Sequence, residues 1–396
     1  MSAEVAYPRR VSLLLVSHSY PPVLGGSEIE AQRVCAGLLR RGHNVTVLCA
    51  SNPPMPQCSY WTDPAGVPVL IFGKGLRPVW RDWAFALGVA WTLFRQRRQY
   101  QLVYFLMQGL HLAIGLPVAR YLRKSIVMKV SGSSIITLMG RSRAGRLELT
   151  CLRKWAQRVM VLNAGIAAEA EAAGLRREQL LWMPNPVDTE EFSPCDRGHR
   201  SALRARLTLS QQALAVTFVG RLAPEKELPS LIEAFVSVAK EVPRAVLILV
   251  GDGPVRKHLE VMAGELHLKA SIRFAGQQTP VQVSEWLQAS DVFALVSSNE
   301  GFPCSLAEAM SSGLPSVVSD IPANLQLIDH GVHGLHATMR SAPSIAAALT
   351  QLLGDEVLRT RMGLAARQRV TDNYSLDRVL DRYEAMFSEV LDRGPR

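Results

Sequence analysis

The 396-residue chain has no closely spaced cysteines, no long apolar run and no recognisable leader. Its six cysteines are scattered without C-x-x-C spacing or neighbouring histidines, which argues against both a disulfide framework and a zinc site. The longest apolar runs, such as residues 11–16 and 245–250, have the length of strands and are too short to cross a bilayer. The first residues lack the pattern of a cleavable signal. We therefore expect reduced thiols and a protein that is made and kept in the cytoplasm.

Signatures of nucleic-acid binding are also missing: there is no zinc finger, no RNA-recognition motif and no uninterrupted basic tract. The net charge is nevertheless +10, and it is distributed unevenly. Residues 1–190 carry 23 Lys+Arg against 11 Asp+Glu, whereas residues 191–396 carry 21 against 23. A basic first half predicts an anionic partner such as a phosphorylated substrate or an acidic lipid surface, and we expect no nucleic acid.

Apolar strands alternate with helical patterns along both halves of the chain, which is typical of parallel α/β sheets. A polar, proline-rich stretch at residues 184–194 separates the two series. The pattern predicts two Rossmann-like, doubly wound α/β domains at residues 1–190 and 191–370, facing each other across a cleft. Residues 371–396 are expected to form a C-terminal helix that packs back on the body, because their apolar residues have helical spacing. The expected strands are 11–16, 44–49, 102–106, 125–130, 159–162, 180–183, 215–219, 245–250, 272–275, 292–296 and 316–318.

Residues 80–98 read as a helix that combines three tryptophans with a basic end. Helices of this composition can lie in a membrane interface. They can equally cover a sheet, and the sequence leaves both interpretations open.

Two glutamates, Glu300 and Glu308, flank a Gly-Phe-Pro loop between an expected strand and a helix that ends at Gly313. Carboxylates accept hydrogen bonds, so this loop suits a ligand with hydroxyl donors, and the adjoining helix N-terminus suits an anionic group. A sugar joined to a nucleoside diphosphate is such a ligand. The alternative is a capping box, Ser305-x-x-Glu308, in which Glu308 only satisfies amides at the start of the helix.

Two cations, Arg221 and Lys226, follow the strand at residues 215–219. The carboxyl ends of strands are where ligands bind in α/β sheets, and a guanidinium together with an ammonium suits a diphosphate. The alternative is that Lys226 only pairs with Glu225 or Glu227 at the surface.

Two glycine loops are weaker indications of nucleotide binding. Gly25 and Gly26 precede a helix and would allow close approach of a phosphate to the backbone. Gly251 and Gly253 follow a strand, but Arg256 stands where a dinucleotide fingerprint has its third glycine, so an NAD site is poorly supported.

Together these motifs resemble those of the family 4 retaining glycosyltransferases, which have the GT-B fold. The resemblance covers nearly the whole chain and is most specific over residues 215–320. It rests on Gly220-Arg-Leu-x-x-x-Lys226, Gly251-Asp-Gly-Pro254, Glu300-Gly-Phe-Pro with Glu308-Ala-Met, the Pro-Pro-x-x-Gly-Gly loop, Arg41-Gly-His-x-Val-Thr-Val, Pro184-Asn-x-Val-Asp and Tyr374.

The resemblance implies a metal-independent hexosyltransferase that moves a sugar from a nucleotide-diphosphate sugar to an acceptor, with no cofactor. The implied catalytic residues are Arg221, Lys226 and Glu300, the two cations neutralising the leaving diphosphate. In the donor site Gly26 would hold the phosphates, Glu308 the ribose, and Glu300 with the amides of Gly301 to Pro303 the sugar. The implied donor-binding residues are Gly26, Arg221, Lys226, Glu300, Gly301, Phe302, Pro303 and Glu308.

For the acceptor the resemblance implies the basic first domain, with Gly25, His111 and Ser131. The acceptor would be a glycan or a lipid-linked glycan in glycolipid, lipopolysaccharide or exopolysaccharide synthesis, with peripheral contact to the anionic inner face of the cell membrane. The chain departs from the family where histidines typically follow the third and fourth strands, since it has Met107-Gln108 and Ser131-Gly132 there. A catalytically silent nucleotide-sugar or glycan-binding protein on the same fold is therefore the alternative hypothesis.

Overall fold

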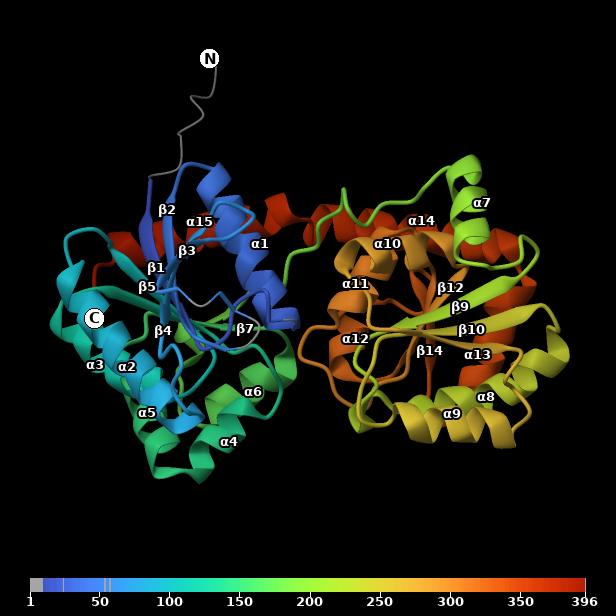
Figure 1. Ribbon diagram of the computed structural model, residues 1–396, viewed down its shortest axis with the longest axis horizontal. Helices are drawn as coiled ribbons and strands as arrows, with labels where there is room; N and C mark the ends of the chain where they lie inside the picture. Colours follow the sequence, from blue (N-terminus) through green and yellow to red (C-terminus); the bar gives the residue numbers. More distant parts are fainter. Residues whose placement is uncertain (1–9, 24, 53–54, 57, 396) are drawn as a thin grey trace, which may run out of the picture. The chain divides into compact units, whose positions relative to one another are not determined.

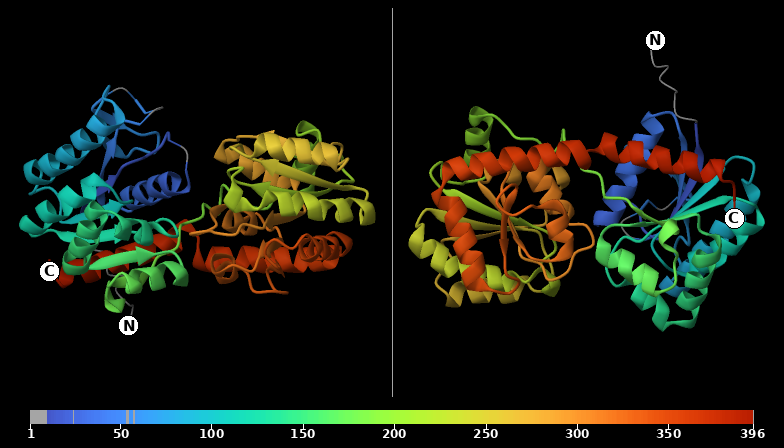
Figure 2. Two further views of the ribbon diagram at one scale, coloured as in Figure 1. Left: turned by 90° about the horizontal axis from the view of Figure 1, so that it is seen from below. Right: turned by 180° about the vertical axis from the view of Figure 1, so that it is seen from behind.

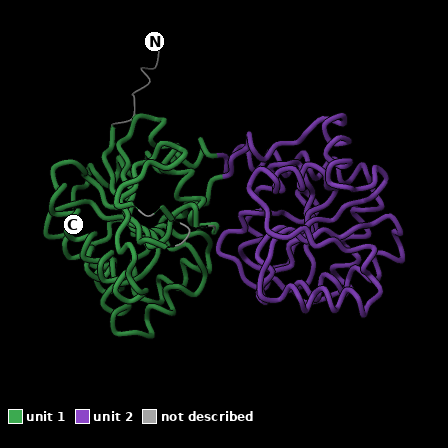
Figure 3. The backbone as a smooth tube through the Cα atoms, in the orientation of Figure 1, with its two compact units in different colours: residues 1–186, 376–396 green, residues 187–375 purple. Residues whose placement is uncertain are grey.

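The computed structural model describes residues 10–23, 25–52, 55–56 and 58–395, and it divides into two compact units (Figure 3). Unit 1 combines residues 1–186 with residues 376–396, and unit 2 comprises residues 187–375. The last helix of the chain therefore belongs to the unit in which the chain begins.

Unit 1 is built on an eight-stranded sheet in the order β3-β4-β2-β1-β5-β6-β7-β8 (Figure 1). The β3–β4 pair is antiparallel, and the other neighbouring strands run parallel. Strands β5 and β6 are buried at every position, as expected where helices cover both faces of a parallel sheet. The strands are β1 (Ser12–Ser17), β2 (Asn44–Ala50), β3 (Tyr60–Thr62), β4 (Pro68–Phe72), β5 (Leu102–Leu106), β6 (Ser125–Lys129), β7 (Arg158–Val161) and β8 (Leu180–Trp182).

Successive residues of the unit 1 strands face opposite helix layers. Tyr104 and Leu106 of β5 pack in a core cluster with α1 and α15, whereas Phe105 lies against Gly115 of α3. Helices α2, α3 and α5 pack in series on that second face (Figures 1 and 2). The helices of unit 1 are α1 (Gly26–Arg40), α2 (Pro78–Arg95), α3 (Leu110–Tyr121), α4 (Ile135–Arg141), α5 (Arg143–Trp155), α6 (Ala164–Ala172), the 3-10 helix η1 (Arg177–Gln179) and α15 (Leu376–Asp392).

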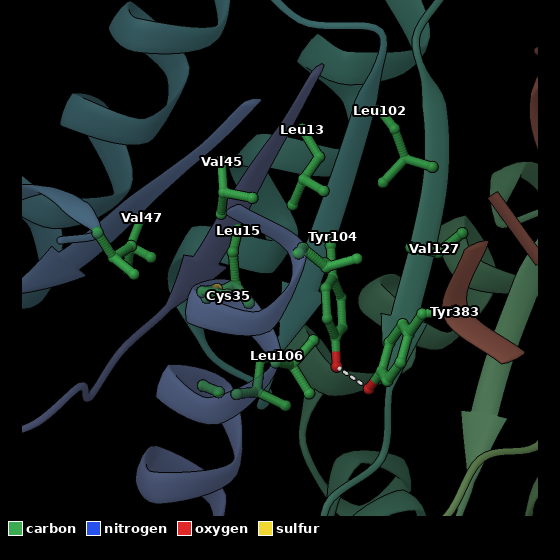
Figure 4. Packing of buried hydrophobic residues seen from close by; sticks show 14 of the residues in the cluster. Leu13, Leu15, Cys35, Val45, Val47, Leu102, Tyr104, Leu106, Val127 and Tyr383 are labelled. Atoms are coloured by element: carbon green, nitrogen blue, oxygen red, sulfur yellow. Dashed lines mark hydrogen bonds between the residues drawn. The ribbon is translucent and has the colours of Figure 1, made fainter. Parts of the chain in front are cut away.

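The C-terminal helix α15 packs on α1 through an apolar face and an ionic edge. Tyr383 reaches the core, where its hydroxyl lies 3.1 Å from that of Tyr104 (Figure 4). At the edge, Arg41 donates hydrogen bonds to Asp377, Asp381 and Glu384 of α15. Burial of the apolar face supplies most of the stabilisation, because exposed ion pairs contribute little.

Unit 2 has a six-stranded sheet in the order β11-β10-β9-β12-β13-β14, and every pairing is parallel. The expected strand at residues 245–250 coincides with β10, and the fold class of two doubly wound α/β domains is confirmed. Short, weakly apolar β14 was not expected. The strands are β9 (Leu214–Val219), β10 (Ala245–Val250), β11 (Ile272–Gly276), β12 (Val292–Leu295), β13 (Ser316–Ser319) and β14 (Gly334–Ala337).

Helices again lie on both sides of the unit 2 sheet (Figure 2). Local signals explain several of their ends: Thr279 and Gln282 form a capping box at the start of α10, and Gly313 takes a left-handed conformation after α11. The helices are α7 (Arg197–Arg206), the 3-10 helix η2 (Pro224–Lys226), α8 (Leu228–Glu241), α9 (Arg256–Glu265), α10 (Pro280–Ala289), α11 (Cys304–Ser311), α12 (Pro322–Leu327), α13 (Ala342–Gly354) and α14 (Glu356–Asn373).

Candidate active site

The strand order of unit 2 places two loops side by side at one edge of its sheet. Strands β9 and β12 are neighbours, but the chain leaves β9 toward β10 and leaves β12 toward β13, on the opposite side. Such a switch point opens a crevice at the carboxyl ends of the strands, where α/β sheets bind ligands. The loop after β9 carries Arg221 and Lys226, and the loop after β12 carries Glu300.

Lys226 and Glu300 form the centre of this crevice. Lys226 Nζ donates to Glu300 Oε1 across 2.6 Å, and Ser297 Oγ donates to the same oxygen across 2.7 Å. The two charged side chains are only 17% and 11% exposed. The alternative that Lys226 pairs with Glu225 or Glu227 is wrong, because the strand order brings a more distant carboxylate to it.

Arg221 is the second cation of the crevice, and it is much more open to solvent. Its guanidinium Nη2 lies 2.8 Å from Glu225 Oε1, and its side chain is 68% exposed. The Glu225 carbonyl oxygen accepts hydrogen bonds from the amide and hydroxyl of Ser298, at 2.9 and 3.2 Å. These bonds join the loop after β9, which carries both cations, to the loop after β12.

Glu227 has a backbone conformation that favours glycine. It has φ +50° and ψ +33°, a left-handed conformation that glycine adopts without cost. Its carboxylate pairs with Arg340 at 2.6 Å, and this hydrogen bond lowers the pKa of Glu227 below its ordinary value. The ion-pair partner of Glu227 is thus Arg340, whereas that of Lys226 is Glu300.

Helix α11 begins two residues earlier than the capping-box alternative requires. Its N-cap is Pro303, no side chain caps it, and Ser305 lies inside the first turn. The predicted capping box of Ser305 with Glu308 is therefore wrong, and Glu308 projects from the middle of a short helix. The expectation that Pro303 donates an amide is also wrong, because proline has no N–H. Only Gly301 and Phe302 can supply backbone donors in that part of the loop.

The glycines after β10 serve close packing between loops. A Cβ on Gly251 would lie 1.9 Å from the carbonyl oxygen of Gly220, and one on Gly253 would lie 2.3 Å from that of Leu222. Both contacts are far inside van der Waals distance. These glycines let the loop after β10 support the one that carries Arg221, so their role does not require an NAD site.

Unit 1 has its own switch point, between β1 and β5. His18 follows β1 directly, and its Nε2 lies 3.0 Å from Asp82 Oδ1 of α2. His111 lies in the first turn of α3, after β5, with its ring centroid 6.4 Å from that of His18. The sequence analysis missed His18 and Asp82. The position of His18 one residue past a strand was an available signal, whereas its pairing with Asp82 has no local signature.

His111 is a buried, neutral imidazole. Its ring lies 5.0 Å from that of Phe85, and its Nε2 has no hydrogen-bond partner in the described part of the chain. Burial, and secondly the nearby His18, lower its pKa to about 3. A histidine in this state can donate or accept a hydrogen bond but does not carry charge near neutral pH.

The other residues expected in unit 1 lie at the same sheet edge. Gly25 is the N-cap of α1 and Gly26 its first residue, while Ser131 follows β6 by two positions. A Cβ on Gly25 would lie 2.2 Å from Glu28 Oε2, so the glycine makes room for that carboxyl group. Burial raises the pKa of Glu28. No group of three or more potential metal ligands occurs among the residues that the structure describes.

Two family models match the chain in succession. The model described as Glycosyltransferase Family 4 matches residues 24–191, and the model described as Glycosyl transferases group 1 matches residues 199–369. The second match contains Arg221, Lys226, Glu300 and Glu308.

Curated relatives match over about half of their length. An N-acetyl-alpha-D-glucosaminyl L-malate synthase of Bacillus anthracis is 29% identical over 189 residues, which are 48% of this chain and 49% of that protein. The Escherichia coli UDP-Gal:alpha-D-GlcNAc-diphosphoundecaprenol alpha-1,3-galactosyltransferase is 29% identical over 213 residues, 53% of this chain and 54% of that protein.

Solved structures match the fold over nearly the whole chain. Anabaena HepE, solved with UDP and glucose, aligns with a TM-score of 0.80 at 20% identity, covering 96% of this chain and all of that one. WaaG, a glycosyltransferase of lipopolysaccharide biosynthesis, aligns with a TM-score of 0.72 at 18% identity, covering 94% and 99%. The expected GT-B fold is thereby confirmed. The two family models together match residues 24–191 and 199–369, and these matches show that the chain belongs to the family 4 glycosyltransferases.

Proposed function

We propose that the chain is a retaining glycosyltransferase that moves a hexose from a nucleotide-diphosphate sugar to a glycan or lipid-linked acceptor. The observation that carries the proposal is the pairing of Lys226 with Glu300, beside Arg221, at the switch point of the unit 2 sheet. The cations there suit the diphosphate of such a donor, and the carboxylate can accept hydrogen bonds from its sugar hydroxyls. The Escherichia coli relative has UDP-Gal in its name, and HepE was solved with UDP-glucose.

Unit 2 would bind the donor. Arg221 and Lys226 would contact the diphosphate and stabilise the negative charge that grows on it as the bond to the sugar breaks. Glu300, with the amides of Gly301 and Phe302, would hold sugar hydroxyls, and Glu308 would hold the ribose. In this arrangement the cations supply the electrostatic catalysis, and the chain needs no metal for that step.

Unit 1 would bind the acceptor. Gly25, Ser131 and His111 lie at the carboxyl ends of its strands, and His18 with Asp82 adds a polar pair at the same edge. Gly26, at the start of α1, would contribute an amide toward the donor phosphates. The basic charge of this half suits a phosphate-bearing acceptor, such as a lipid diphosphate sugar at the inner face of the cell membrane, in glycolipid, lipopolysaccharide or exopolysaccharide synthesis.

A panel of nucleotide sugars, tested by calorimetry and by transfer to lipid-linked acceptors, tests the proposal. We expect one donor to bind and to be consumed, and we expect Arg221→Ala and Lys226→Ala to lose both activities. Lys240→Ala and Arg244→Ala are matched controls, because both side chains are exposed before the amino end of β10. Donor binding without transfer or hydrolysis would support the silent binding protein instead, which no relative named here favours. Undiminished turnover in both site variants would refute the site.

A further inference from the structure

Helix α2 presents a continuous apolar stripe to solvent. Trp80, Trp83, Leu87, Trp91 and Phe94 recur at spacings of three and four residues, and each is 46–67% exposed. At about 100° per residue they occupy one narrow face of the helix. Large contiguous apolar patches on a soluble surface mark interaction sites.

The opposite face of α2 is the one that packs on unit 1. Phe85, Val89 and Leu93 are fully buried there, and α2 lies beside α3 (Figure 1). The helix therefore does not need the tryptophans to cover its sheet. The sequence left open whether this helix covers a sheet or lies in a membrane interface. The buried face covers the sheet, and the exposed aromatic stripe needs a separate explanation.

The charge around the stripe has one sign. Residues 83–147 contain no Asp or Glu, and nine of their ten Lys+Arg are at least partly exposed, the tenth being the buried Lys129. Arg95, Arg97 and Arg98 are exposed at the end of α2, where Lys124 donates to the Tyr100 carbonyl and so ties the end of α3 to that of α2. The acidic residue of α2, Asp82, is paired with His18.

We infer that the outer face of α2 is a docking surface for an anionic phospholipid bilayer. The proposed function enters this inference only as the reason why the protein would contact a membrane. Amphipathic aromatic rings favour the headgroup region, and exposed arginines beside them attract acidic lipids. No helix among the described residues is long and apolar enough to cross a membrane, so the contact would be interfacial.

The same helix connects this surface to the carboxyl edge of the unit 1 sheet. Asp82, which is paired with His18 at the end of β1, lies between Trp80 and Trp83 in the sequence of α2. A bilayer bound to the stripe would thus lie against the element that reaches the acceptor side of unit 1. A lipid-linked acceptor could then be bound without leaving the membrane.

Vesicle cosedimentation without donor or acceptor tests the surface. We expect the protein to bind vesicles of phosphatidylcholine with about 30% phosphatidylglycerol at least tenfold more tightly than pure phosphatidylcholine. Trp80→Ser with Trp91→Ser should weaken binding to the anionic vesicles by about tenfold or more. The control Val281→Ser with Leu364→Ser removes exposed apolar residues from unit 2 and should change binding less than twofold.

A second variant tests the charge. Arg95→Gln with Arg98→Gln should reduce binding to the anionic vesicles about 30-fold and leave binding to neutral vesicles unchanged. Wild-type protein that stays in solution with anionic vesicles overturns the inference, as does equal binding by wild type and the Trp80 and Trp91 variant. A dimer that forms through the stripe would also overturn the inference. Gel filtration would then show a dimer for the wild type and a monomer for the Trp80 and Trp91 variant. Sugar transfer to a soluble acceptor is measured separately, so a failure there refutes the proposed function and not the surface.

Discussion

Lys226 and Glu300 lie 74 residues apart in the sequence, and their charged atoms lie 2.6 Å apart. The carboxylate of Glu300 thus neutralises the cation that we assign to the donor diphosphate. The pair therefore sets a balance between phosphate binding and sugar binding.

We expect Glu300→Gln to shift that balance. Gln keeps the size of the side chain and its hydrogen bonding but leaves the charge of Lys226 uncompensated. A nucleoside diphosphate should then bind about fivefold more tightly, the value of a modest ion pair, while kcat with the nucleotide sugar should fall at least tenfold.

Calorimetry with the nucleoside diphosphate and steady-state kinetics with its sugar would measure the two effects. Glu265→Gln, an exposed carboxylate at the end of α9, is the control. Weaker diphosphate binding in Glu300→Gln would contradict the assignment of Lys226 to the phosphates.

Most strands of both units could be predicted from the sequence because they are apolar on both faces, although the apolar β4 was missed. Residues 102–106 and 245–250 coincide with β5 and β10, since parallel strands covered by helices form unbroken apolar runs. Short β3 and β14 carry no such run, so no pattern distinguishes them from loops.

The pairings within the sites could not be predicted. His18 meets Asp82 and Lys226 meets Glu300 only because the strand order places their loops together, and local spacing does not determine strand order. The sequence did place Lys226 and Glu300 in loops that follow apolar strands, and the structure pairs them. The alternative that paired Lys226 with Glu225 or Glu227 considered only carboxylates that are close in the sequence.

The buried pair of Lys129 and Glu30 is expected to be a major determinant of unit 1 stability. Lys129 Nζ lies 2.6 Å from Glu30 Oε1, both side chains are nearly inaccessible, and the hydroxyl of Tyr383 donates to the same oxygen. Lys129→Met leaves a buried carboxylate without its cation and should cost about 3–5 kcal/mol of unfolding free energy.

The double variant Lys129→Met with Glu30→Leu should recover most of that loss, because it removes both buried charges. Urea unfolding followed by circular dichroism would compare the three proteins. Equal destabilisation of the single and double variants would show that packing, and not charge, accounts for the effect.

His111 should make unit 1 less stable in acid. Its folded pKa of about 3 lies below the value of about 6.5 for an unfolded histidine, so the unfolded chain binds the proton first. The contribution of the neutral ring to the free energy of unfolding is complete above pH 6.5. It is lost as the pH falls toward 3, by about 1.4 kcal/mol per pH unit.

We expect His111→Gln to flatten this part of the stability profile by about 2 kcal/mol between pH 6.5 and pH 5. Urea midpoints at several pH values would show it, with His199→Gln, at an exposed position, as control. Parallel profiles for wild type and His111→Gln would contradict a buried neutral ring.

Glu148 should act in the opposite direction, on the alkaline side. Burial raises the pKa of this α5 carboxyl group to about 7, although it accepts a hydrogen bond from the Gly109 amide. Because the folded pKa lies above the unfolded value of about 4.3, the contribution of Glu148 to stability is greatest below pH 4.3 and is lost as the pH rises through 7. Ionised Glu148 thus costs about 2–4 kcal/mol at pH 8.

Glu148→Gln cannot ionise and still offers an oxygen to Gly109. We expect it to be more stable than wild type by about 2–4 kcal/mol at pH 8 and to approach wild type below pH 5. Urea unfolding across this range measures the difference, and Glu171→Gln, which changes an exposed carboxylate of α6, should show none of it. A constant offset between Glu148→Gln and wild type at every pH would mean that Glu148 does not titrate in this range.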